Sequence, residues 1–177
     1  MKINLSLLLQ LSIFGCLSYF LHELAHLFAH YSLGHQVDFK INHMTLIIPE
    51  TINTPWQQAW VSGSGALFSF AQGGIAFYLL KKRVSIVWFN VLLSAFSLRF
   101  ATALLGLVKS SDEIKTSIAM GLPSYFWTIV MLGGLILMLN SERKVVGITL
   151  KQVLGHFMFL LLKLFTYQLH NCPSFLQ

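Results

Sequence analysis

Long apolar runs separated by short polar stretches dominate the pattern of the chain. A helix needs about 20 apolar residues to cross the roughly 30 Å hydrocarbon layer of a membrane. Five segments approach this pattern: 5–33, 59–80, 84–108, 122–139 and 147–170. The last is the weakest, because Lys151 and Lys163 interrupt it, although lysines near a helix end can extend to the interface. The pattern predicts an all-α polytopic membrane protein with four to five transmembrane helices.

The pattern changes after the first apolar run. Residues 37–42 alternate between apolar and polar, which is the period of a strand, and Pro49 and Pro55 close the segment as a loop. We therefore expect a short β-like segment at the membrane face. No internal repeat or low-complexity linker divides the chain, so we expect a single integral membrane domain over 1–177.

Composition supports the membrane class. Of the 177 residues, 55% are hydrophobic and only 10% are charged, and the mean hydropathy is +0.69. A soluble domain carries about 25% charged residues, so this chain is too apolar to cover a soluble globule. Disorder and a coiled coil are excluded as well, and two cysteines, Cys16 and Cys172, make no disulfide framework.

The basic charge predicts orientation rather than nucleic-acid binding. The net charge is +6, but no cluster of lysine and arginine is longer than 81–83, so no nucleic-acid partner is expected. With five spans, the loops on the N-terminal side hold Lys2, Lys81, Lys82, Arg83, Arg143 and Lys144, and the opposite loops hold Lys40, Lys109 and Lys115. This excess favours a cytoplasmic N-terminus, with the bacterial inner membrane as the expected location.

The beginning of the chain has an alternative interpretation. Lys2 followed by an apolar run is typical of a signal peptide, and Cys16 resembles a lipoprotein cleavage position. The apolar run continues well beyond the roughly 7–15 residues of a signal peptide core. We therefore expect an uncleaved first helix.

Two histidines and a glutamate stand within the first apolar run. His22 and His26 are four residues apart, which places both imidazoles on one face of a helix, where they can bind one metal ion. Glu23 points in a neighbouring direction and can reach a metal-bound water. A carboxylate in a membrane span costs about 2.5–3.5 kcal/mol on insertion scales and usually marks function. A polar cluster that only bonds neighbouring helices is the alternative.

The stretch 20–34, which reads FLHELAHLFAHYSLG, resembles the site-2 protease family of intramembrane zinc metalloproteases. In that family the motif helix ends shortly afterwards at a glycine, as at Gly34, and a β-rich segment follows, which 37–42 resembles. The next span opens with a glycine motif, and SGSGA at 62–66 is similar to it. The resemblance implies a metalloprotease-like core over 5–125 and additional transmembrane helices over 126–177.

The family's third ligand is an aspartate about two spans downstream of the motif. The histidines lie near the far end of the first span, and the third span returns to that side, so Asp112 and Glu113 emerge on the side of the motif, whereas Glu142 does not. We expect Asp112 as the third ligand, with Glu113 as the alternative. The sequence departs from the family because no glycine follows Asp112 and no asparagine occurs in 63–69.

Three further polar residues invite a functional interpretation. One zinc ion cannot bind His22, His26 and His30 along an intact helix, so we expect His30 to be a hydrogen-bonded interface residue. His35 could turn back only if the helix ends early. Arg99, inside the third run, is either a counter-ion or substrate-carboxylate contact near the site, or a structural residue that pairs with a backbone carbonyl or extends toward the nearer interface.

Together these features predict an intramembrane zinc metalloendopeptidase. His22, His26 and Asp112 would hold Zn²⁺, and Glu23 would act as general base on the zinc-activated water. The expected partners are the lipid bilayer and a membrane protein or peptide substrate. The alternative is a non-catalytic metal-binding or regulatory membrane protein on the same fold.

Overall fold

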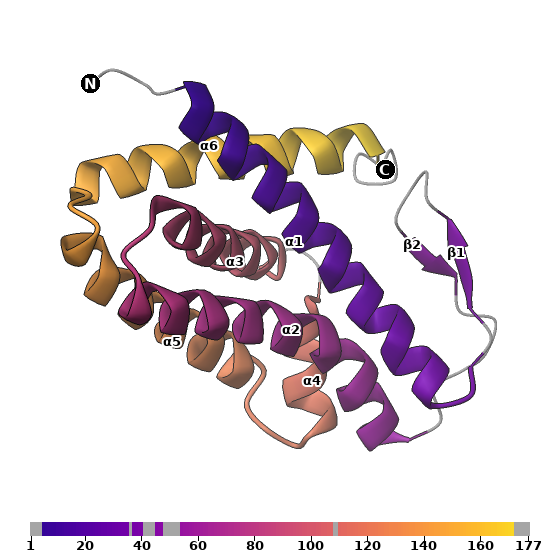
Figure 1. Cartoon of the computed structure of the whole chain (residues 1–177). Coiled ribbons are helices and arrows are strands. Elements are labelled where there is room, and N and C mark those ends of the chain that lie inside the picture. The colour runs from indigo at the N-terminus through magenta and orange to yellow at the C-terminus, as the bar shows by residue number, and fades with distance from the viewer. Residues whose placement is uncertain (1–4, 36, 41–44, 48–53, 108–109, 172–177) are drawn as a thin grey trace.

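The computed structural model describes residues 5–35, 37–40, 45–47, 54–107 and 110–171. Within these ranges the regular structure is helical apart from two three-residue strands, with short turns between the elements (Figure 1). The elements in chain order are α1 (Leu5–Ser32), β1 (Asp38–Lys40), β2 (Thr45–Ile47), α2 (Pro55–Lys82), α3 (Ile86–Leu105), α4 (Asp112–Ala119), α5 (Phe126–Val145) and α6 (Leu150–Asn171). The short helix α4 was not predicted from the sequence.

Three of these helices are long and apolar enough to cross a membrane: Leu9–Ser32, Pro55–Lys82 and Ile86–Leu105. They correspond to the first three apolar runs. Helix α5 begins later than its run predicts and carries charged residues in its last turns, and the apolar stretch of α6 whose side chains the structure describes, Leu150–Leu162, is shorter. A fourth and a fifth crossing therefore stay predictions.

Helix α3 forms the centre of the bundle and contacts α1, α2, α5 and α6 (Figure 1). Its side chains Phe89, Leu92 and Leu93 are fully buried. Helices α2 and α5 approach closely beside it, since a Cβ built on Gly73 would overlap the side chain of Leu135. A helix that is apolar on all sides is expected at such a central position.

A tight turn ends α1. Gly34 adopts a positive φ of 76°, a conformation that glycine reaches without a steric cost. The amide of Gly34 donates to the carbonyl of Tyr31 at 3.0 Å, and the amide of His35 donates to that of His30 at 3.1 Å, as in a Schellman motif. The turn folds His35 back beside His30.

The segment after this turn contains β1 and β2, which pair antiparallel with Phe39 opposite Leu46. Both strands follow the C-terminal end of α1 after a short connection (Figure 1). β1 falls within the segment 37–42, whose alternation predicts a strand, while 41–44 lie outside the described residues.

Candidate metal centre

The first two residues of the site come from one face of α1. His22 and His26 are 3% and 8% exposed, and their rings meet edge to face with centroids 4.6 Å apart. Their Nε2 atoms are 3.1 Å apart. The spacing predicted from the sequence therefore places two imidazole nitrogens at one buried point.

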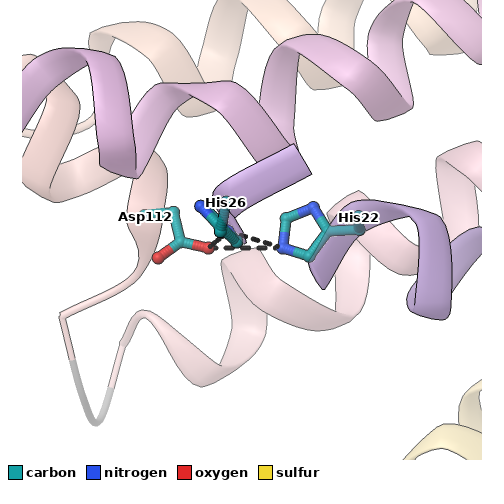
Figure 2. A group of neighbouring side chains, drawn as sticks. All are labelled: His22, His26 and Asp112. Atoms are coloured by element: carbon teal, nitrogen blue, oxygen red, sulfur yellow. Dashed lines mark hydrogen bonds and ion pairs between the residues drawn. The ribbon is translucent and has the colours of Figure 1, made fainter. Parts of the chain in front are cut away.

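Asp112 reaches this point from the start of α4. Ser111 caps the helix by accepting a hydrogen bond from the amide of Ile114 at 3.4 Å, and Asp112 is the first helical residue, where a negative charge is favourable. Its Oδ2 lies 3.4 Å from Nε2 of His22 and 3.2 Å from Nε2 of His26 (Figure 2). The chain after α3 thus returns an acid to the two histidines, as expected from the sequence.

Asp112 is also the most solvent-exposed of the three residues. Its side chain is 29% exposed, against 4% for that of His22 and 10% for that of His26. Burial opposes ionisation of Asp112, but contact with the rings of His22 and His26 outweighs it and holds the pKa of the carboxyl well below its usual value. The group therefore presents a carboxylate to any bound cation.

Helix α2 packs directly against the rings of His22 and His26. A Cβ built on Gly65 would lie 2.5 Å from Nε2 of His26 and would also overlap the ring of His22, so only glycine leaves room for both. Nδ1 of His26 donates to the carbonyl of Val61 at 2.7 Å, and Ser64 donates to the same carbonyl at 2.8 Å. The SGSGA segment at 62–66, singled out in the sequence, thus lies against the histidines.

The contact with Val61 fixes how His26 can act. An imidazole that donates through Nδ1 keeps the lone pair of Nε2 for a ligand, and metal-binding histidines commonly make such a contact to a backbone carbonyl. The sequence did not predict this partner, because every residue has a backbone carbonyl and no residue type marks the one that His26 contacts.

Arg99 and Glu113 form the other side of the site. Arg99, fully buried, donates through Nη1 to Oε1 of Glu113 at 2.7 Å and through Nη2 to Nδ1 of His22 at 3.0 Å. Glu113, the alternative third ligand, therefore pairs with Arg99 and is not among the residues that converge on the candidate site. The arrangement agrees with the interpretation of Arg99 as a counter-ion near the site, whereas an extension toward an interface is wrong, because the side chain is fully buried.

A cavity of about 1080 Å³ opens beside the group. Glu23, His26 and Asp112 line it together with two donors, Gln58 and Lys115. Glu23 thus faces the same space as two of the three converging residues. This is the placement that a general base would need.

The second histidine pair is separate from this group. His30 and His35 are buried, and their Nδ1 atoms are 3.1 Å apart, so one ring donates to the other. This agrees with the expectation that His30 is a hydrogen-bonded residue rather than a third ligand on the helix.

His22, His26 and Asp112 together fit a metal ion. One ligand atom from each lies within 4.8 Å of the others, and all three side chains come from buried or half-buried positions. Two imidazoles and one carboxylate are a set that zinc binds in catalytic sites with a fourth position left open. The cavity beside Asp112 provides space for that position.

Comparison with known proteins found no match: no family model, no curated protein and no solved structure. The resemblance of 20–34 to site-2 proteases therefore rests on the motif and its surroundings. What this chain does must be argued from the geometry of the site.

Proposed function

We propose that the protein is an intramembrane zinc metallopeptidase that hydrolyses peptide bonds in or near the bilayer. The observation that supports this most is the convergence of His22, His26 and Asp112 beside a cavity that Glu23 also lines. When bound, zinc lowers the pKa of a water molecule from 15.7 to about 7 and polarises a substrate carbonyl. The chain supplies the remaining steps.

Glu23 acts as the general base. It takes a proton from the attacking water and returns it to the leaving amine, which such a group does with a gain of about 10²–10⁴ in rate. Gln58 and Lys115 line the same cavity and can donate hydrogen bonds to the oxyanion that develops at the carbonyl.

The depth of the site suggests where the substrate is cut. His26 lies roughly 9 Å from the end of α1 at 1.5 Å per residue, so the scissile bond enters near one face of the membrane. A helical substrate must unwind to expose its amide there. The paired strands β1 and β2 follow α1 in the chain and offer an edge onto which an unwound peptide could add.

The rest of the chain completes the proposed membrane domain. Helices α1, α2 and α3 cross the bilayer, with the apolar parts of α5 and α6 as the fourth and fifth crossings. The bacterial inner membrane is the proposed location, on the basis of composition and short loops, and the excess of positive charge in the loops favours a cytoplasmic N-terminus.

The proposal is tested by cleavage in proteoliposomes that contain the full chain, zinc and a panel of transmembrane peptides, with fragments identified by mass spectrometry. Glu23→Gln should retain zinc and lose at least 100-fold in cleavage rate. Glu142→Gln is the matched control, because it makes the same change at a buried carboxylate paired with Lys81, outside the residues that line the cavity. Equal cleavage by Glu23→Gln and wild type would contradict the assigned base.

A metal-binding protein without hydrolytic activity is the second candidate. The absence of an asparagine in 63–69 favours it, since the resemblance to site-2 proteases implies an asparagine there that contacts the transition state rather than the metal. Zinc bound by the three residues with no fragment from any peptide in the panel would select this candidate.

A further inference from the structure

Arg99 makes a hydrogen bond that conflicts with metal binding by its partner. A guanidinium group can only donate, so Nδ1 of His22 must accept the hydrogen bond from Nη2 of Arg99 at 3.0 Å. A neutral imidazole that accepts at Nδ1 carries its proton on Nε2. In His22, Nε2 is the atom that faces Asp112 and His26, and a metal needs the lone pair of that atom.

The two histidines of the site therefore carry their protons on different ring nitrogens. His26 donates through Nδ1 to the carbonyl of Val61 and keeps its Nε2 lone pair for a ligand. His22 is held by Arg99 in the opposite tautomer. Only one of the two rings is ready to bind.

Arg99 and Glu113 have a second arrangement within reach. Within the described part of the chain, neither Nε of Arg99 nor Oε2 of Glu113 has a hydrogen-bond partner, although both atoms are buried. Only the contact between Nη1 and Oε1, at 2.7 Å, joins the two side chains. A guanidinium and a carboxylate bind more strongly when two parallel hydrogen bonds form, and both unused atoms would then be paired.

We propose that Arg99 sets the tautomer of His22, and that metal binding requires Arg99 to leave His22 and bind both oxygens of Glu113. The ring stays neutral in the exchange: water takes the proton from Nε2 and returns one to Nδ1. Glu113 also lines a second cavity of about 570 Å³. Arg99 is thus a positioning residue that acts on the metal through His22, and Glu113 is the group that draws it away.

This inference rests on the proposed metal site but not on hydrolysis, so zinc affinity is its readout. The dissociation constant is measured on the full chain in detergent by competition with a chromophoric chelator. Glu113→Gln keeps the shape of the side chain but removes the second anionic oxygen, so Arg99 stays on His22 and zinc binding should weaken at least roughly tenfold.

The decisive variant combines Glu113→Gln with Arg99→Met. It removes the donor to Nδ1 and a positive charge, so zinc binding should recover at least roughly tenfold relative to Glu113→Gln alone. If Arg99 only supported the fold, removing it as well would not restore affinity, and that result would overturn the inference. Glu142→Gln, at the other buried ion pair, should leave the dissociation constant within about twofold of wild type.

A second measurement needs no variant. Nitrogen-15 NMR of the histidine side chains of the wild-type chain, before and after adding zinc, reports which ring nitrogen carries the proton. We expect His22 to be protonated at Nε2 without zinc and at Nδ1 with it. Protonation at Nδ1 in both samples would overturn the inference alone, whereas a wild type that binds no zinc would overturn both it and the proposed function.

Discussion

Gly65 provides a sharp test of how α2 holds the metal ligands. A Cβ added by Gly65→Ala would lie 2.5 Å from Nε2 of His26 and would overlap the ring of His22. The first of these contacts is about 0.9 Å shorter than the 3.4 Å at which ordinary contact begins. One or both rings must therefore move by a distance of that order.

Such a shift is large for a metal site. Ligand distances are held within about 0.2 Å, and indirect disturbances of a ligand already cost 10- to 100-fold in affinity. We expect Gly65→Ala to weaken zinc binding by at least 100-fold, which corresponds to about 2.7 kcal/mol. The helix itself should not suffer, because alanine is favoured over glycine in a helix interior by about 0.5–1 kcal/mol.

The assay compares zinc dissociation constants with the midpoint of thermal unfolding in the presence of a chelator. Gly74→Ala is the matched control, because it lies in α2 and a Cβ there would meet no atom within 4 Å. We expect the control to bind zinc as wild type does and to unfold no earlier than wild type. Wild-type zinc affinity in Gly65→Ala would refute the proposed packing of α2 against the two rings.

Three further outcomes follow from the same contacts. Removing zinc with a chelator should lower the unfolding temperature of wild type, as measured by calorimetry. The loss of stability is about 2.7 kcal/mol if zinc was present at 100 times its dissociation constant. The unfolding temperature of His26→Ala should not change on addition of the chelator. Lys81→Ala should destabilise the chain by about 2 kcal/mol in denaturant titration, because it leaves the buried carboxylate of Glu142 unpaired, whereas the exposed Lys82→Ala should cost no more than about 1 kcal/mol. Ser64→Ala removes one donor from the carbonyl that holds His26 and should weaken zinc binding less than tenfold; a loss as large as that of Gly65→Ala would contradict the minor role of Ser64.

The sequence predicted the parts of the fold that depend on apolar length. Three long runs mark α1, α2 and α3 because a membrane crossing requires continuous apolar residues. Helix α4 was missed because it is short and polar, although Ser111 followed by Asp112 and Glu113 is a typical start of a helix and could have indicated it. The later start of α5 was missed because apolar length alone does not fix where a helix begins.

The sequence predicted the three candidate ligands, because their residue types and positions along the chain are enough to bring them together. Helical spacing places His22 and His26 together, and counting the crossings brings Asp112 to their side. Neither argument could choose a partner for Arg99 or the close approach at Gly65, because both depend on how helices far apart in the sequence are rotated against one another. The contact of His26 with a carbonyl is equally invisible before the fold is known.

The central claim is that two imidazoles of α1 and the carboxylate of Asp112 hold one zinc ion. Zinc K-edge X-ray absorption on the purified full chain tests it most directly, with His26→Ala and Asp112→Ala as comparisons. The account predicts one zinc per chain with nitrogen and oxygen neighbours at about 2.0–2.2 Å, two imidazoles in wild type and one in His26→Ala. Sulfur neighbours, or a spectrum that neither substitution changes, would contradict it.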